Sequence, residues 1–307
     1  MAALAGRGVF VGTSSWKYPG WCGQLYTRSR YDLKGQLNER LFKGECLKEY
    51  GEVFKTVGVD STYYAFPGPS LMFGLTRAVP NDFLFAFKVT GDITIKKFTK
   101  QSRFGPRAGQ PNPHYLDAEL FKRTFLPAFQ SFKPQVGLLM FEFSRFHSSD
   151  YERGRDFVAD LDRFLGALPK EFPYGVEIRN RYFLKPEYFE VLARHGVTHV
   201  YNNWSAMPTV GVQMAIAGSA TNPQVMAARF LLTPGRKYQD AVDKFGPYDE
   251  VKEANPEARA AGAKLMAEGA ATPGRRTFIL VNNRLEGSAL GTIGGMLERV
   301  SGSSNAG

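Results

Sequence analysis

Cysteine and histidine are both scarce in this chain of 307 residues. It holds two cysteines, Cys22 and Cys46, and four histidines. Two cysteines are too few for a disulfide framework, and a cysteine metal site usually needs three or four. A divalent metal site prefers several histidines and carboxylates, but His147, in a loop after a predicted strand, is the only histidine that we consider for a site. The sequence therefore predicts neither a metal site nor a resident cofactor.

Long apolar runs are missing as well. No stretch approaches the roughly 20 apolar residues that a membrane helix needs. The opening residues, MAALAGRGVFVG, are too short and too rich in glycine for a secretory signal peptide. We therefore expect a cytoplasmic location and no membrane association.

Acidic residues are outnumbered by basic ones, and the formal net charge is +10. Such an excess favours anionic partners, which include nucleic acids and phosphorylated metabolites. The basic residues are spread along the chain, with one denser patch from Lys96 to Arg103. A nucleic-acid-binding module usually shows a tighter basic run or a known motif. Two interpretations therefore stay open, an anion-binding protein and an ordinary solvated basic surface.

Short apolar runs alternate with helical patterns along the whole chain. The strand-like runs are Val9–Thr13, Thr56–Asp60, Phe83–Val89, Val136–Phe141, Gly175–Ile178, Thr198–Tyr201, Ala228–Leu232 and Phe278–Val281. The helical patterns are Asn38–Tyr50, Ala118–Phe132, Tyr151–Leu168, Pro186–His195, Pro256–Glu268 and Ser288–Val300. This alternation is typical of parallel βαβ units.

Eight strand-like runs and this length predict an α/β fold, a single-domain (β/α)8 barrel of the TIM type. We expect the barrel to span residues 8–300 and a disordered tail to follow at 301–307. A doubly wound sheet is the alternative, but the turn after the first run lacks its glycine fingerprint. Three long loops, Gly91–Tyr115, Asn203–Gln224 and Thr233–Asn255, each follow a strand. In a barrel such loops form the face that carries the active site.

Polar residues stand at the carboxyl ends of most predicted strands. Lys88 ends a buried apolar run, so it is either paired or placed for use as a nucleophile or base. Glu177 and Arg179 lie two apart on one strand and therefore share a face. They either pair with each other or hold a hydroxyl and an anionic group of a ligand. Arg229 lies inside a strand, where an arginine is rarely buried unless paired, and Asp60 or Glu177 would be its partner.

Several common hydrolytic sites find no support. Glu142 and Glu177 lie on neighbouring strands and could approach each other, but neither has the motif of a glycosidase carboxylate pair. No nucleophile elbow supports a catalytic serine. No phosphate-binding P-loop is present.

An aromatic stretch, GTSSWKYPGW at residues 12–21, follows the first predicted strand. In a barrel it becomes the first loop of the active-site face. We expect Trp16, Tyr18 and Trp21 to form an apolar or stacking wall of the site, and packing under the loop is the alternative for Trp21. Strand alternation suggests that only one of Ser14 and Ser15 points inward.

The same blocks carry a family resemblance. They are residues 12–21, Val57-Gly58-Val59-Asp60-Ser61-Thr62-Tyr63-Tyr64, Phe85-Ala86-Phe87-Lys88, Val176-Glu177-Ile178-Arg179, Arg229-Phe230-Leu231 with Tyr238 behind it, and Val281-Asn282-Asn283. In their order and spacing the chain resembles the DUF72, or YecE-like, family from about Val9 to Val300. The resemblance implies a TIM-barrel-like fold. It also implies a loose relation to sugar isomerases, although a fold does not fix a function.

The chain departs from the family pattern at several positions. Asp60 stands where the family usually has asparagine. The E-x-R-H pattern appears with Asn180 in place of its histidine, and the R-L-H-G pattern appears with Leu231 in place of its histidine. A mechanism that relied on those two histidines is therefore not expected here.

Together these patterns predict an enzyme, or a former enzyme, that binds a small anionic or polyhydroxylated ligand, such as a sugar phosphate, and the family resemblance implies isomerase- or lyase-like chemistry. Lys88, Glu177 and Asp60 are the catalytic candidates, with Glu177 the first choice for proton transfer. The ligand-binding candidates are Ser14, Trp16, Tyr18, Tyr63, Arg179, Asn203, Arg229, Tyr238 and Asn282. A nucleic-acid-binding or nucleic-acid-processing protein is the alternative, and a non-catalytic scaffold is a third interpretation.

Overall fold

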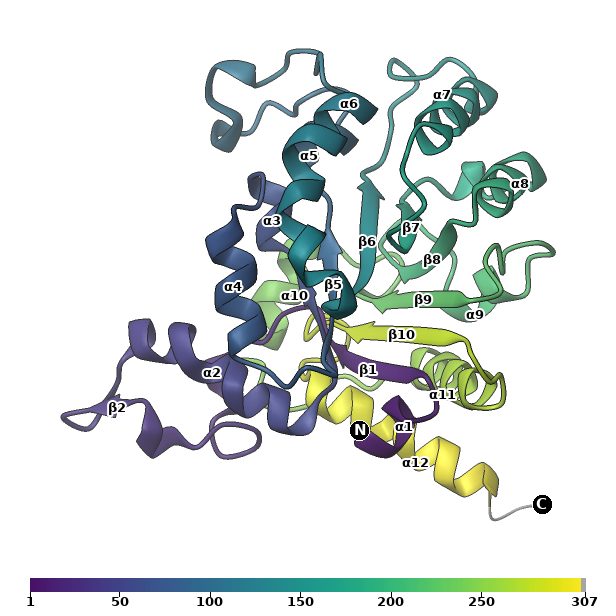
Figure 1. Ribbon diagram of the computed structural model, residues 1–307. Helices are drawn as coiled ribbons and strands as arrows, with labels where there is room; N and C mark the ends of the chain where they lie inside the picture. The colour runs from purple at the N-terminus through teal and green to yellow at the C-terminus, as the bar shows by residue number, and fades with distance from the viewer. Residues whose placement is uncertain (305–307) are drawn as a thin grey trace.

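Eight parallel strands close into a barrel in the computed structural model, which describes residues 1–304 (Figure 1). The strands are β1 (Val9–Thr13), β4 (Thr56–Val59), β5 (Leu84–Lys88), β6 (Val136–Phe143), β7 (Tyr174–Ile178), β8 (Thr198–Asn203), β9 (Val225–Phe230) and β10 (Arg276–Val281). Each strand pairs with the next in the chain, and β10 pairs with β1. The predicted (β/α)8 barrel is therefore confirmed.

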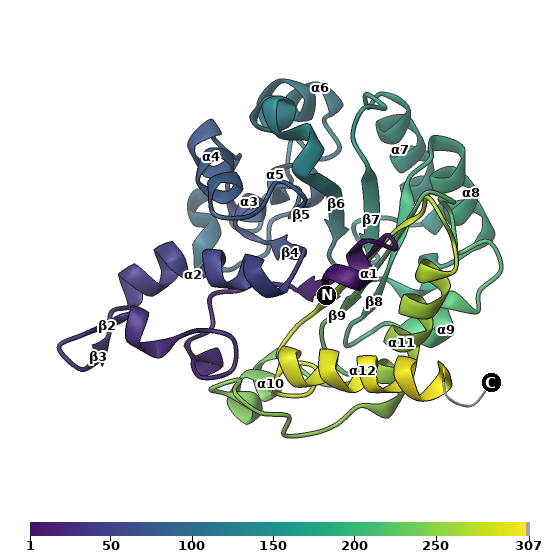
Figure 2. The same ribbon diagram turned by 60° about the horizontal axis from the view of Figure 1, so that its bottom comes forward.

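Helices surround the barrel and connect its strands. The longer ones are α2 (Glu39–Val53), α4 (Pro69–Arg77), α7 (Gly154–Gly166), α8 (Pro186–His195), α11 (Pro256–Ala270) and α12 (Ala289–Ser304), and short helical turns cover 118–135. A small hairpin of β2 (Asp32–Leu33) and β3 (Gln36–Leu37) projects away from the barrel, while α11 and α12 lie side by side against it (Figure 2). No helix in the described part of the chain is long and apolar enough to span a bilayer.

The fold differs from the sequence-based prediction in several places. Strand β9 starts at Val225 rather than Ala228 and ends at Phe230 rather than Leu232. Its first residues include methionine and alanine, which have weak strand propensity, so pairing between β8 and β10 sets its position. Helix α4 was not predicted, because Pro67, Gly68 and Pro69 at its start resemble a loop. Pro69 lies in the first helical turn, where proline is tolerated, and Met72 and Leu75 are buried.

The carboxyl terminus also differs. Helix α12 continues to Ser304, so the first residues of the predicted tail are helical. The rest of that tail, 305–307, lies outside the described residues. The three predicted long loops do follow strands, and they contain the short helices α5 (Gly91–Thr94), α9 (Val210–Met214) and α10 (Tyr238–Phe245).

The period of two along each strand decides what fills the barrel. Its interior holds an apolar cluster of Leu84, Ala86, Leu138, Met140, Val200, Val225, Ala227, Phe278 and Leu280. Two residues further along four of these strands, the same face presents Lys88, Glu142, Arg229 and Asn282. A charged layer therefore lies on an apolar plug at the carboxyl end of the barrel.

Barrel closure depends on a glycine. Strand β1 meets β4 through the pairing of Thr13 with Val57. A Cβ atom placed on Gly12 would lie 2.0 Å from the carbonyl oxygen of Thr56 on β4. Only glycine allows the two backbones to approach this closely.

Candidate functional site

A polar cavity of about 580 Å³ opens at the carboxyl ends of the strands. It is lined by Ser15, Tyr18, Asp60, Tyr63, Tyr64, Lys88, Gln101, Arg103, Glu142, Ser144, Arg179, Trp204, Arg229, Leu231, Leu232, Tyr238, Asn282 and Arg284. We call this cavity the mouth pocket. Five of its lining side chains are cationic and two are acidic, an excess of three positive charges. A cavity of this size and place is typical of a TIM-barrel active site.

Glu142, at the carboxyl end of β6, is the centre of the charged floor. Its carboxylate forms an ion pair with the Lys88 ammonium, and its Oε2 lies 2.7 Å from Nη2 of Arg179. Nη1 of Arg229 lies 3.6 Å from the same oxygen. Three cations from three different strands therefore converge on one carboxylate.

Glu177, on β7, lies below this floor. Its two carboxylate oxygens accept separate hydrogen bonds, one from Nε of Arg179 at 2.9 Å and one from Nη1 of Arg229 at 2.7 Å. The side chain is fully buried and does not line the mouth pocket. Nη2 of Arg229 also lies 3.5 Å from the Asp60 carboxylate. Both of the acids predicted as partners of Arg229, Asp60 and Glu177, therefore contact it.

The charges of this network hold one another in the ionised state. Burial raises the pKa of Glu142, but Arg179, Lys88 and Arg229 outweigh it and hold the pKa at about 2. Burial acts likewise on Glu177, whose pKa is nevertheless lowered by Arg229 and Arg179. The nearby carboxylates, above all Glu177, raise the pKa of the Arg229 guanidinium despite its burial. Both glutamates are therefore anions at neutral pH and poor proton acceptors.

Aromatic rings orient the cations of the floor. The Lys88 ammonium lies 4.1 Å from the centre of the Tyr63 ring, and the Arg179 guanidinium lies 3.8 Å from the ring of Trp204. Cation–π contacts of this kind restrict the side chains while leaving their hydrogen-bond donors available. Burial raises the pKa of Tyr63 to about 12, so its hydroxyl stays protonated.

Two arginines at the rim have no carboxylate partner within ion-pair distance in the described part of the chain. They are Arg103 and Arg284. Arg284 stacks on Tyr238 at 4.6 Å and donates a hydrogen bond to Asn282. Its Nε is buried and has no hydrogen-bond partner. An unpaired guanidinium that faces a polar cavity is a ready-made site for an anionic group.

Most of the predicted site residues do meet in the mouth pocket. These are Tyr18, Asp60, Tyr63, Lys88, Arg179, Arg229, Tyr238 and Asn282. Asp60 is the carboxylate most open to it, with 41% of its side chain exposed. These predictions rested on the alternation of side chains along each strand and on the positions of the loops that follow the strands.

The structure places four predicted residues outside the pocket lining. Glu177 is the buried counter-ion described above, so proton transfer to a ligand in the pocket is not available to it. Ser14 is buried and Ser15 lines the pocket instead. Trp16 packs into the outer core, since its ring is only 7% exposed. Asn203 faces away from the interior and accepts a hydrogen bond from the backbone N–H of Val210 at the start of α9.

Sequence reasoning missed other lining residues. Glu142 is a polar residue at a strand end, the same signal that identified Lys88, but it is absent from the predicted site residues because it lacks a glycosidase motif. Trp204 follows β8 directly, and Arg284 lies three residues after the end of β10, so both stand at strand ends like the residues that were selected. Ser144 also follows its strand, β6, directly, whereas Gln101 and Arg103 lie in the long segment after β5, where no periodic pattern places them at the pocket.

Trp21 and two of the histidines have structural roles. Trp21 is fully buried and does not line the mouth pocket, and its indole N–H donates to the carbonyl of Tyr248, so of its two interpretations the structure favours packing under the first loop. His195 ends α8 and pairs with Asp162 on α7 at 2.6 Å. His199 is buried in β8, and burial lowers its pKa to about 4. Among the described residues no three His, Cys, Asp or Glu side chains come together as a metal site.

The comparisons with known proteins identify the family and agree with the fold. Residues 10–306 match the family described as "Protein of unknown function DUF72". The chain belongs to the DUF72 family. The UPF0759 protein YecE of Escherichia coli K12 is 26% identical over 199 residues, which are 61% of this chain and 54% of that protein. The chain thus spans about half the length of the curated relatives that it matches.

Solved DUF72 structures share the fold. A DUF72 family protein from Enterococcus faecalis V583 superposes with a TM-score of 0.62 and 17% identity, and the match covers 95% of each chain. A DUF72 family protein from Thermotoga maritima MSB8 gives a TM-score of 0.61 and 20% identity over 95% of this chain and 99% of that one. At these identities the likeness shows the fold alone, and the function must be argued from the mouth pocket.

Proposed function

We propose that this DUF72 protein is an enzyme that binds a small polyhydroxylated anion, of the sugar-phosphate type, in the mouth pocket. One observation carries the proposal. Arg284 faces a polar cavity without a carboxylate partner, and its Nε is buried without a hydrogen bond. Phosphate oxygens supply the acceptors that such a guanidinium lacks, and they match its planar geometry.

The floor of the pocket would bind the rest of the ligand. Lys88 and Arg179 have donors beyond those that Glu142 uses, while Glu142 is a fixed acceptor. Donors and acceptors that alternate on one surface are suited to ligand hydroxyl groups. Because the ion pairs hold these side chains in place before binding, little conformational entropy is lost when the ligand enters.

Asp60 takes the catalytic role that the sequence first assigned to Glu177. Its carboxylate is the more exposed of the two, and its contact with Arg229 is a long one of 3.5 Å. A carboxylate at the pocket wall can remove a proton from a carbon next to a carbonyl, and Lys88 or Arg179 can stabilise the oxyanion that forms. This chemistry is that of an aldose–ketose isomerase or a related lyase.

Binding is tested with Arg284→Gln in isothermal titration against a panel of sugar phosphates and the corresponding free sugars. The matched control is Arg276→Gln, because Arg276 is exposed at the first residue of β10, at the opposite end of the barrel. We expect at least one sugar phosphate to bind wild type and the control alike, and Arg284→Gln to lose about tenfold in affinity. A panel without any binder, or equal binding by Arg284→Gln, would contradict the proposal.

Proton transfer is tested by incubating the protein with each compound in D₂O and following deuterium uptake by NMR. We expect wild type to exchange a carbon-bound proton next to the carbonyl group, and Asp60→Asn to abolish the exchange while it still binds the compound. Exchange that survives in Asp60→Asn would assign the base to another residue.

A further inference from the structure

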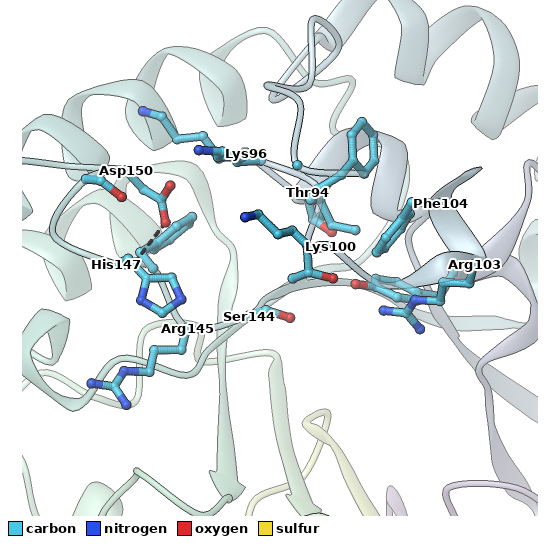
Figure 3. A pocket seen from close by; sticks show the side chains of 17 residues that line it. Thr94, Lys96, Lys100, Arg103, Phe104, Ser144, Arg145, His147 and Asp150 are labelled. Carbon is cyan, nitrogen blue, oxygen red and sulfur yellow. Dashed lines mark hydrogen bonds between the residues drawn. The ribbon is translucent and has the colours of Figure 1, made fainter. Parts of the chain in front are cut away.

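A second cavity, of about 410 Å³, lies beside the mouth pocket (Figure 3). Residues 94–104 form one of its sides and residues 144–150, after β6, form the other. The two cavities share only the lining residues Tyr63, Arg103 and Ser144, so they are neighbours and the rest of their linings differ. We call the second cavity the side pocket.

One end of the side pocket is strongly basic. Lys96, Arg145 and His147 lie at this end with Asp150, and Lys100 lies in the middle (Figure 3). Asp150 is the one acidic lining residue, against five cationic ones, and it accepts a hydrogen bond from the backbone N–H of His147. Within residues 1–304, neither Lys100 nor Arg145 has a carboxylate within ion-pair distance. An excess of four positive charges suits a doubly charged anion better than a single carboxylate.

The other end is aromatic. Phe98 and Phe104 pack with their ring centres 5.2 Å apart, and Phe104 is labelled at this end together with Arg103 (Figure 3). The Arg103 guanidinium lies 4.7 Å from the Phe104 ring. Flat rings stack well on such a surface, and each base–aromatic contact contributes measurably to affinity.

A buried hydroxyl offers a further hydrogen bond to a ligand in the side pocket. Thr94 lines the side pocket, its side chain is 2% exposed, and its Oγ1 has no hydrogen-bond partner. A buried polar atom without a hydrogen-bond partner is uncommon, because an unmade hydrogen bond costs free energy. A ligand that brings a donor or acceptor to Thr94 would restore the bond.

We infer that the side pocket binds a nucleoside monophosphate. The phosphate lies between Lys100 and Arg145, the base stacks on Phe104, and a polar group of the ligand bonds to Thr94. The volume is within the range of small-molecule sites, and it exceeds the need of a free phosphate ion. This site does not depend on the function proposed for the mouth pocket, because Lys100, Arg145 and Phe104 do not line that pocket.

Isothermal titration with AMP, UMP, adenosine and inorganic phosphate tests the site. We expect AMP or UMP to bind more tightly than adenosine or phosphate. The double variant Lys100→Gln/Arg145→Gln should weaken nucleotide binding by about 100-fold, on the order of tenfold for each charged contact. Phe104→Ala should weaken AMP and adenosine alike.

The matched control is Lys34→Gln/Arg276→Gln, which removes the same charges from the exposed β2–β3 hairpin and the opposite end of the barrel. It should bind AMP as wild type does, and so should Arg284→Gln in the mouth pocket. Circular dichroism confirms that each variant is folded. The inference is overturned if no mononucleotide binds, if phosphate alone binds as tightly as AMP, or if Lys100→Gln/Arg145→Gln binds normally. It is also overturned if only an oligonucleotide binds, since that outcome favours a nucleic-acid surface.

Discussion

The buried pair of Arg229 and Glu177 offers the sharpest test of the charged floor. Its side chains are 4% and 0% exposed, and the shortest N–O distance is 2.7 Å. Arg229→Met fills similar space but leaves Glu177 with Arg179 alone, at 2.9 Å. Removing one partner of a buried pair costs about 3–5 kcal/mol, and the remaining arginine places the expected loss near the lower end.

The double variant Arg229→Met/Glu177→Met should lose less stability than the two single changes together, because no unpaired carboxylate stays buried. We expect a coupling energy of about 2 kcal/mol from the double-mutant cycle. Urea unfolding followed by circular dichroism and by tryptophan fluorescence gives the free energies, since Trp16 and Trp21 are both buried reporters.

A surface pair serves as the matched control. Arg194 and Asp162 approach to 2.8 Å, but their side chains are 58% and 35% exposed. Arg194→Met should therefore cost less than about 1 kcal/mol. If Arg229→Met costs no more than Arg194→Met, or if the changes at Arg229 and Glu177 are additive, burial does not set the strength of this network and the reasoning is wrong.

Three further outcomes are expected. The folded pKa of Glu142 is held at about 2, below its ordinary 4.5, so the stability that its ionised form contributes above pH 4.5 is lost as the pH falls towards 2. Glu142→Gln should reduce the change in unfolding free energy between pH 7 and 2, measured by urea unfolding, by on the order of 3 kcal/mol. His199 is buried in its neutral form with its pKa lowered to about 4, so its contribution is present above pH 6.5 and lost as the pH falls to 4, and His199→Phe should flatten the stability profile over that window. An unchanged profile in either variant would contradict the assigned cause. Gly12→Ala places a Cβ atom 2.0 Å from the Thr56 carbonyl oxygen and should lower the unfolding free energy by about 1–3 kcal/mol. Gly44→Ala, in α2 with open space around it, should raise the unfolding free energy. A Gly12→Ala variant as stable as wild type would mean that β1 and β4 can separate.

The architecture of the barrel was predictable because its strands are short, apolar and regularly spaced. Prediction failed where tertiary contacts decide the local structure. Strand β9 begins among methionine and alanine residues that only its two neighbours hold in an extended form. Helix α4 depends on burying Met72 and Leu75, which outweighs a proline- and glycine-rich sequence.

The candidate site was predictable to a similar extent. Alternation along the strands placed Lys88, Arg179 and Arg229 at the mouth, and the rarity of unpaired buried arginine predicted the partners of Arg229. Alternation does not give depth, however. Glu177 and Glu142 are in register on neighbouring strands, yet only Glu142 lines the pocket. Arg179 and Arg229 contact both carboxylates, so the difference in depth depends on the three-dimensional packing, which a linear sequence does not show.

The substitutions at the two family histidine positions indicate what kind of chemistry this mouth supports. Asn180 uses its side-chain amide to bind both the N–H and the carbonyl of Phe146, so it fixes the loop after β6. Leu231 is an apolar wall residue. None of the residues that line the mouth pocket is a histidine, the side chain whose ordinary pKa lies near neutrality. Its positive charge comes instead mainly from arginines, which stay protonated throughout the physiological range. The mouth is therefore suited to holding an anion with a constant field, and any proton transfer there depends on a carboxylate such as Asp60.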